Sequence, residues 1–522
     1  MSSDTSRWAV ATPHASATDA AEKVFREGGN AVDAALAAAS ALTVVYPHQC
    51  SIGGDCIALV GLPDGTTHVV MGVGRTPADM SLDSFADMTT MPVDGALTVT
   101  VPGAVGAWHT MAERWGSVGL TSSLEVARRM ASEGVPVAAG LGRDLFREEH
   151  RILADPGLRQ VFAPNGRPLA AGEQLVQPRL AASLQAIAES GQDALYRGDL
   201  ARSITATLQS RGSAMTTEDF AIHETVVDVP VSATYDGREY VTAPPPSQGA
   251  FFLEAVTALE LIRLATGKPL DLDGPDAATV AMVLGDVAED RDRLLGDPAV
   301  SPLDLVQLMG TRAREIAQLD SAPATGPRNP PPTGDTVAVV TSDGSGTWVS
   351  LIQSLFHAFG SGILDPESGI ILHNRGASFS VSPNHPGAVA PSRRPPHTLM
   401  PVLTRDDGVL SGAHGTMGGR AQAQIHAQLA LRLATGDLPG AAIGRPRWVV
   451  GLMEEGYRDQ RTVGVEANAP AAVAHALRAT GFEVTELPAN DDGVGHSQMV
   501  RRYPSGLAAA SDPRSDGSAR IG

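Results

Sequence analysis

The chain contains the run Gly334-Asp335-Thr336-Val337-Ala338-Val339-Val340 directly after a tail rich in proline and glycine at residues 322–332. A turn at residues 342–346 and a second apolar run at residues 347–352 follow it. This pattern predicts a linker that leads into a β-hairpin, with Thr336 at the start of the first strand. A linker placed there suggests that the chain is cut between Asp335 and Thr336, which would make Thr336 a new N-terminus.

A free N-terminus on Thr336 would have a chemical use. The hydroxyl of threonine is a poor nucleophile at its ordinary pKa, whereas an α-amino group titrates near neutral pH and can take the hydroxyl proton. An N-terminal threonine therefore carries a nucleophile and a base in one residue. The alternative is that Thr336 only opens a strand, where threonine is common.

Length and composition limit the classes of function. The 522 residues suggest two or more domains, and 43% hydrophobic with 19% charged residues is typical of a soluble globular protein. A net charge of −19 argues against nucleic acid or an anionic membrane surface as a partner. The two cysteines, Cys50 and Cys56, form neither a disulfide framework nor a zinc site, and they are expected to be small buried residues.

The sequence shows no motif for targeting or for binding a cofactor. Residues 1–11 lack the basic and apolar regions of a signal peptide, and no stretch predicts a transmembrane helix. The expected location is the cytoplasm. The sequence shows no phosphate-binding loop and no metal motif, so no cofactor is expected.

Helices and strands alternate along the chain. Residues 18–27 and 31–45 predict two helices, and Asn30 is suited to cap the second. Residues 104–189 are mostly helical in pattern, residues 226–234 and 239–242 predict strands, and one more helix is expected within residues 299–321.

Two glycine-containing loops could carry chemistry. Arg75 lies in a glycine-rich turn after a predicted strand, where a guanidinium can hold a carboxylate in a fork, or can simply face solvent. Gly418 and Gly419 precede a predicted helix at residues 421–434, so their backbone N–H groups could bind a developing oxyanion. The alternative for these glycines is a plain tight turn.

With these residues placed, the chain closely resembles the γ-glutamyltranspeptidase family of N-terminal-nucleophile hydrolases from about residue 9 to residue 517. Many separate motifs carry the resemblance. They include GGNAVDAA at residues 28–35, PPPS at 244–247, DRDR at 290–293, FGSGI at 359–363 and SDPR at 511–514.

The resemblance implies an α+β fold of four αββα layers. It also implies a precursor that cuts itself into a large subunit, residues 1–335, and a small subunit, residues 336–522. The two subunits would stay together as one αββα unit. Whether two such units form a dimer stays open.

The resemblance also implies roles for individual residues. Thr336 matches the nucleophile of the family, so autocleavage would break the bond between Asp335 and Thr336. Ser354 matches a position that places a hydroxyl near the nucleophile. Gly418 and Gly419 match the oxyanion glycines, and Arg75 matches the arginine that holds the α-carboxylate of the substrate.

The chain departs from typical members in its substrate-binding positions. The stretch that normally reads the glutamyl amino group with an acidic residue is HNRGAS at residues 373–378, which has no carboxylate and carries Arg375. His397 and Thr398 replace a Ser-Ser pair, and Phe356 stands where an asparagine is usual. An ammonium group loses its anionic partner here, while Arg375 favours a second negative charge. The pattern resembles the acylase-like branch, and it argues against glutathione as the substrate.

The sequence therefore predicts an autoprocessing threonine hydrolase or transferase. It would cleave the acyl bond of a small carboxylate-bearing substrate, a γ-glutamyl or related acyl amide, through an acyl-enzyme. One alternative is a C–C bond hydrolase that removes an oxalyl-type fragment in an alkylproline pathway, as some relatives do. The other is an unprocessed, inactive binding protein, against which the presence of Thr336, Ser354, Gly418 and Gly419 argues.

Overall fold

Two antiparallel sheets form the centre of the protein. The computed structural model describes residues 7–318, 335–451 and 461–522. The seven-stranded sheet has the order β20 (Ser518–Ile521), β1 (Trp8–Thr12), β9 (Asp335–Asp343), β10 (Trp348–Phe356), β2 (Asp55–Gly61), β3 (Thr67–Gly72) and β6 (Val226–Asp228). The six-stranded sheet has the order β19 (Gly506–Ser511), β18 (Ser497–Tyr503), β14 (Val409–Thr416), β13 (Val402–Asp406), β8 (Arg238–Thr242) and β7 (Val231–Tyr235).

The two sheets pack face to face. Alternate residues of β9 point to opposite faces, as the period of a strand requires. Ala338 and Val340 pack with Leu403 and Ala413 of the other sheet, whereas Val337 and Val339 join the core on the opposite face. The sheets approach closely at Gly415, where an added Cβ would lie 2.7 Å from the Cβ of Ala338.

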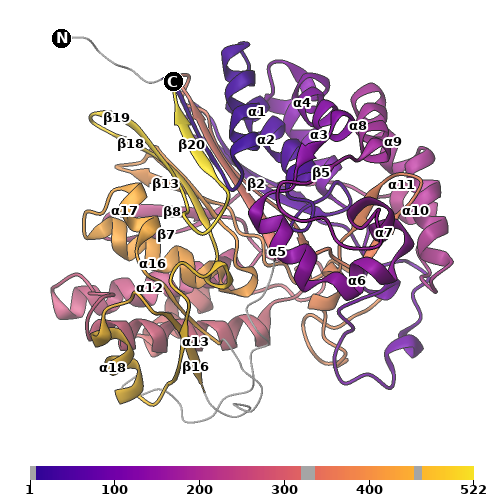
Figure 1. Ribbon diagram of the computed structural model, residues 1–522. Coiled ribbons are helices and arrows are strands. Elements are labelled where there is room, and N and C mark those ends of the chain that lie inside the picture. Colours follow the sequence, from indigo (N-terminus) through magenta and orange to yellow (C-terminus); the bar gives the residue numbers. More distant parts are fainter. Residues whose placement is uncertain (1–6, 319–334, 452–460) are drawn as a thin grey trace.

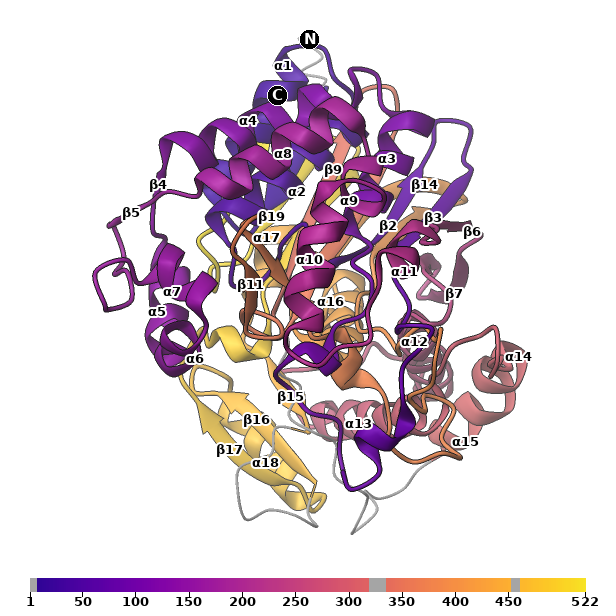
Figure 2. The ribbon, with the colours of Figure 1, turned by 90° about the vertical axis from the view of Figure 1, so that its right-hand side faces the viewer.

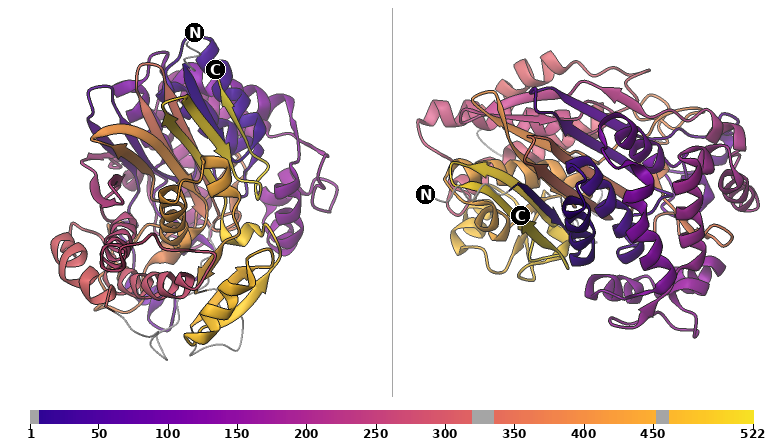
Figure 3. Two further views of the ribbon diagram at one scale, coloured as in Figure 1. Left: turned by 90° about the vertical axis from the view of Figure 1, so that its left-hand side faces the viewer. Right: turned by 90° about the horizontal axis from the view of Figure 1, so that it is seen from above.

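Helices cover both outer faces, which gives four layers (Figure 1). On the seven-stranded sheet lie α1 (Ala15–Arg26), α2 (Ala31–Val45), α3 (Ala104–Trp115), α4 (Gly119–Glu133) and α8 (Pro178–Ser190), several of which face the viewer in Figure 2. On the six-stranded sheet lie α12 (Gly249–Thr266), α13 (Asp276–Leu294) and α16 (Gln422–Ala434), and the right-hand view of Figure 3 shows the molecule from above. The predicted αββα fold is confirmed. No helix in the described ranges is both long and apolar enough to span a membrane.

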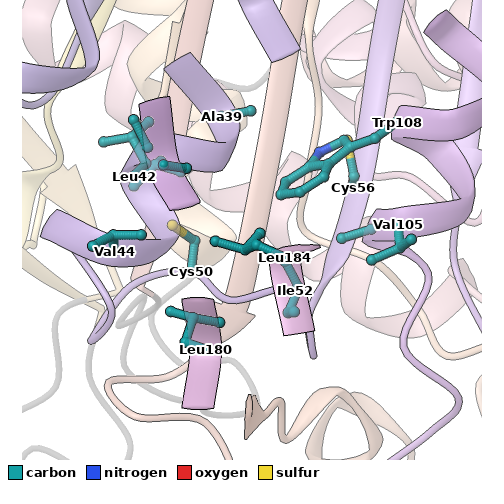
Figure 4. Packing of buried hydrophobic residues seen from close by; sticks show 14 of the residues in the cluster. Ala39, Leu42, Val44, Cys50, Ile52, Cys56, Val105, Trp108, Leu180 and Leu184 are labelled. Carbon is teal, nitrogen blue, oxygen red and sulfur yellow. The ribbon is translucent and has the colours of Figure 1, made fainter. Parts of the chain in front are cut away.

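The helix α2 is buried along its whole length, as its alanine-rich sequence predicts. Asn30 caps it: the side chain accepts hydrogen bonds from the N–H groups of Val32 and Asp33, and Asp33 accepts one from the N–H of Asn30 in return. Cys50 and Cys56 are unpaired and lie among apolar side chains of this layer (Figure 4), so their predicted burial is confirmed.

The hairpin of β9 and β10 lies at the centre of its sheet, and each half of the chain contributes to both sheets. Strands from before residue 335 pair with strands from after it, for example β1 with β9 and β2 with β10. The described strands before and after residue 335 thus share both sheets, and the division into subunits 1–335 and 336–522 stays a prediction. The predicted linker at residues 322–332 lies outside the described residues.

One predicted strand was wrong in detail, and one predicted helix contains a π-helical segment. The strand predicted at residues 226–234 is two strands in different sheets, β6 and β7, because Pro230 lies between them and cannot donate to a ladder. The helix predicted within residues 299–321 is present at residues 305–316 as α14 (Leu305–Gln307), η3 (Leu308–Arg312) and α15 (Ala313–Ile316), which follow one another without a gap, and η3 is a π-helix.

Candidate active site

The β9–β10 hairpin places Thr336 directly opposite Ser354. A tight turn sets this register: Asp343 accepts hydrogen bonds from the N–H groups of Ser345 and Thr347, and Gly346 has a φ of 95°. Thr336 Oγ1 donates a hydrogen bond to Ser354 Oγ over 3.1 Å. Both side chains are buried, so this pair is shielded from water. The predicted proximity of the two hydroxyls is present.

Ser354 also contacts the bond predicted to be cut. Its hydroxyl donates to the backbone carbonyl of Asp335 over 2.6 Å and accepts from the N–H of Phe356 over 2.7 Å. A bulge between Ser354 and Phe356, with Phe356 at a φ of 81°, turns this end of β10 toward Asp335. One hydroxyl thus connects the Thr336 oxygen with the carbonyl that this oxygen would attack.

The two predicted oxyanion glycines follow β14 (Val409–Thr416). Gly418 has a φ of 141° and Gly419 a φ of 51°, which are conformations that side chains strongly disfavour. Gln248 Nε2 donates to the carbonyl of Gly419 over 2.8 Å and to that of Thr398 over 2.6 Å, which holds the turn in place. Gly418 lines the same cavity as Asp335, so the structure brings this glycine to the junction.

This cavity, here called the Asp335 cavity, has a volume of about 440 Å³. Burial raises the pKa of the Asp335 carboxyl well above its usual value, and the nearby carboxyl groups of Asp144 and Asp492 raise it further. The lining consists of Gln49, Val93, Asp94, Asp144, Arg147, Glu148, Arg151, Asp335, His357, Ala358, Met417, Gly418, Asp492 and Gly493.

A second charged group is sealed inside the protein beside Phe356. Arg375 is fully buried, its guanidinium stacks over the Phe356 ring at 4.3 Å, and its Nη1 donates to Thr398 Oγ1 over 2.9 Å. Its Nη2 has no hydrogen-bond partner. The predicted substrate-binding residues Phe356, Arg375, His397 and Thr398 therefore lie together.

Asp55 is the anion of this group, which we call the Asp55 cluster (Asp55, His373, Arg375, His397 and Thr398). Its Oδ2 lies 3.1 Å from His397 Nε2, 3.6 Å from His373 Nδ1 and 3.8 Å from Arg375 Nε. Its Oδ1 accepts a hydrogen bond from the N–H of Gly103.

The pKa values follow from this packing. Burial opposes the charge of Asp55, but His373, His397 and Arg375 outweigh it and hold the pKa of the carboxyl below its usual value. Burial lowers the pKa of His397 to about 3 and that of Arg375 to about 9. At neutral pH the cluster therefore contains one carboxylate, one guanidinium and two neutral imidazoles.

Arg75 lies apart from these two groups. It donates to the carbonyl of Ser392 over 2.8 Å and lies 3.6 Å from Asp297. It lines a separate cavity of about 80 Å³ together with Asp219, His223, Glu224 and Arg394. In this structure Arg75 is thus not in the Asp335 cavity, and its role in binding a carboxylate stays a prediction.

Sequence reasoning missed Asp55, His373 as its partner, and Gln248. Asp55 opens β2 after a glycine pair, and its partner His397 is 342 residues away along the chain. A carboxylate at the start of an otherwise apolar strand is the only local signal. In the described ranges, no group of three or more His, Cys, Asp or Glu side chains is placed to hold a metal ion.

Comparison with known proteins agrees with this geometry. The model of the family described as gamma-glutamyltranspeptidase matches residues 17–522. The chain is 34% identical to the glutathione hydrolase-like YwrD proenzyme of Bacillus subtilis, over 98% of this chain and 97% of that protein. It is 32% identical to the oxamate amidohydrolase proenzyme of Klebsiella pneumoniae, over 97% of each chain.

A solved structure shows the same likeness. The crystal structure of cephalosporin acylase from Bacillus halodurans has a TM-score of 0.89 and 32% identity, covering 99% of this chain and 96% of that one. Family model, sequence relatives and structure all cover nearly the whole chain. The protein therefore belongs to the γ-glutamyltranspeptidase family of N-terminal-nucleophile hydrolases, which are enzymes with hydrolase and transferase activity.

Proposed function

We propose that this chain is a precursor that cuts itself between Asp335 and Thr336, and that the freed Thr336 is the nucleophile of an acyl hydrolase or transferase. The observation that carries the proposal is the Ser354 hydroxyl, which contacts both Thr336 Oγ1 and the carbonyl of Asp335. The relatives named as proenzymes support it.

The cut would proceed as an acyl shift. Thr336 Oγ attacks the carbonyl carbon of Asp335 and gives its proton to Ser354, which gives its own proton to the carbonyl oxygen. The C–N bond then breaks, the proton moves to the leaving nitrogen of Thr336, and water hydrolyses the resulting ester. The new α-amine can serve as the base for the next substrate.

The same atoms would act on a substrate. Thr336 Oγ attacks the substrate carbonyl, the α-amine takes the proton, and the N–H groups at Gly418 and Gly419 stabilise the oxyanion. The amine leaves with that proton, and the acyl-enzyme passes to water or to a second amine. Ser354 positions the nucleophile.

The acyl part of the substrate carries a carboxylate. Arg375 supports this, because its charge is buried, its Nη2 has no partner and it lies against Phe356 at the end of the nucleophile's hairpin. A carboxylate can accept two parallel hydrogen bonds from a guanidinium, so it would give Arg375 Nη2 the partner that it lacks. Thr398 and His397 hold Arg375 and Asp55 in place around it.

The second candidate is hydrolysis of a C–C bond next to an oxalyl-type group. The relative named for oxamate, a small amide with a carboxylate beside the reacting carbonyl, favours so short an acyl group. Analysis of the products from an oxamate-type amide and from a ring-opened dicarboxylate separates the two reactions: only the first releases an amine.

Intact mass under denaturing conditions tests the cut. We expect two fragments, one beginning at Thr336, in place of the 54.0 kDa chain. The Thr336→Ala variant is expected to stay whole, because it lacks the attacking oxygen. A single 54.0 kDa species from both proteins would remove the free amine that the mechanism needs and would favour an inactive binding protein.

A further inference from the structure

Carboxyl groups outnumber arginines in the lining of the Asp335 cavity. Two arginines stand among its lining residues, Arg147 and Arg151, and Arg143 reaches Asp492 from outside over 2.7 Å. Five carboxyl groups line it, those of Asp94, Asp144, Glu148, Asp335 and Asp492. The carboxyl groups outnumber the arginines even when Arg143 is included.

The arginines leave little positive charge for a ligand. Arg151 contacts Asp94, Glu148 and the carbonyls of Ala358 and Gly360 through Nη1 and Nη2, whereas its buried Nε has no hydrogen-bond partner. Arg147 lies 3.1 Å from Asp144, and its side chain is 59% exposed.

His357 adds no charge. Burial lowers its pKa to about 4, so the imidazole is neutral at physiological pH. His48, which lies 3.3 Å from Asp144 behind the cavity wall, is also kept neutral by burial. The carboxyl group of Asp144 therefore gains no full positive charge from the histidine beside it.

Gln49 gives an independent sign of a missing partner. Its side chain lines the cavity, the residue is only 5% exposed, and its Oε1 has no hydrogen-bond partner. A buried acceptor without a donor costs free energy, and such atoms are rare in native proteins. A ligand that brings N–H donors and positive charge would satisfy Gln49 and Asp144 together.

We propose that the Asp335 cavity is the subsite for the amine partner of acyl transfer, and that it binds a molecule with a second, protonated amino group. The inference rests on the proposed function, since it assigns the amine side of the same reaction. A volume of about 440 Å³ suits a small organic molecule. The carboxyl groups here are not placed to hold a metal ion, which favours an organic cation.

The transfer step balances without another reactant. The neutral amino group of the acceptor attacks the carbonyl of the Thr336 ester, and its proton goes to the Thr336 amine. The ester C–O bond breaks, Thr336 Oγ takes that proton back, and an amide is released. The second amino group stays protonated and bound to the carboxylates throughout.

Calorimetric titration with 1,4-diaminobutane tests the subsite directly, with butane-1,4-diol as the uncharged probe of similar length. The titration uses both the processed enzyme and the uncut Thr336→Ala chain. We expect the diamine to bind both proteins and the diol to bind neither. Because binding needs no acyl substrate, a failure here is distinct from a failure of cleavage, which the intact mass reports.

Variants locate the binding. Gln49→Leu and Asp144→Asn are each expected to weaken diamine binding about tenfold, the equivalent of about 1.4 kcal/mol. Asp437→Asn, which removes a carboxylate paired with Arg445 outside the cavity, is the matched control and should bind as the parent does. Absence of diamine binding, or equal binding by all three variants, would overturn the proposal.

Discussion

Thr336 lies between two charged groups that differ in their access to water. The Asp55 cluster is closed: Asp55 and Arg375 are fully buried and balance one another. The Asp335 cavity is open, and its carboxylates outnumber its arginines. Removing the partner of a buried charge costs several kcal/mol, whereas hydrated charges exchange partners at little cost. In the reaction that we propose, the closed cluster selects the acyl group and the open cavity exchanges the amine.

The largest expected difference between the two regions is in stability. Arg375→Met leaves the Asp55 carboxylate buried without a cation, so we expect a loss of about 3–5 kcal/mol. Arg147→Met removes a hydrated arginine from the open cavity and should change the free energy of unfolding by less than about 1 kcal/mol. Urea unfolding of both variants in the uncut Thr336→Ala background measures this, because every protein is then a single chain.

The parent for this comparison is the Thr336→Ala chain itself. Arg375→Lys serves as a second control, since it restores a charge for Asp55 but not the planar fork. It should recover part of the lost stability. Equal losses from the variants at Arg375 and Arg147 would mean that the two regions do not differ in the way their burial indicates.

The next largest expected effect is on the rate of self-cleavage, and it concerns Ser354, whose hydroxyl contacts both regions. Its hydroxyl accepts from Phe356 on the closed side and donates to the carbonyl of Asp335 on the open side. Removing a positioned hydroxyl that carries a proton typically costs a factor of 10² or more. We therefore expect Ser354→Ala to slow self-cleavage by about 10²-fold or more, as followed by intact mass over time.

Ser350→Ala is the matched control for this experiment. Ser350 is a buried serine of the same strand whose hydroxyl donates to the carbonyl of His414, away from Thr336. It should lose a hydrogen bond and keep its cleavage rate. If Ser354→Ala is cut as fast as Ser350→Ala, the Ser354 hydroxyl does not carry the proton between Thr336 and the carbonyl of Asp335.

Local sequence patterns predicted the hairpin that carries Thr336, whereas the four-layer fold and the position of Ser354 were predicted from the family resemblance. The apolar runs around Thr336 and the turn between them predicted the hairpin, because strand and turn signals act over a few residues. The Asp55 cluster could not be derived this way, since Asp55 meets His397 only when β2 and the 397–398 segment are brought together by the fold. Pro230 could have separated β6 from β7, because a missing N–H is a local property.

The smallest expected effects are on the pH dependence of stability, and they have opposite signs in the two regions. His397 has a pKa of about 3 in the folded chain, below its unfolded value, so the unfolded state binds more protons below pH 6.5 and stability falls as the pH falls. Asp144 has a pKa of about 6, raised mainly by burial, so the folded state binds more protons between pH 6 and 4 and stability rises as the pH falls. A difference of one bound proton between the folded and unfolded states changes the free energy of unfolding by at most about 1.4 kcal/mol per pH unit.

Replacing His397 or Asp144 should remove the part of the pH dependence of stability that comes from that side chain. As the pH is lowered from 7 to 5, His397→Gln should become more stable relative to the Thr336→Ala parent. In the parent, His397 binds a proton only in the unfolded state, and the variant lacks this destabilising effect. Asp144→Asn should lose stability over the same range, because it no longer gains from protonation beside Asp335, Arg147 and Asp492. Urea midpoints at pH 7, 6 and 5 measure both trends. Shifts of the same sign would show that the closed cluster and the open cavity do not hold their charges differently.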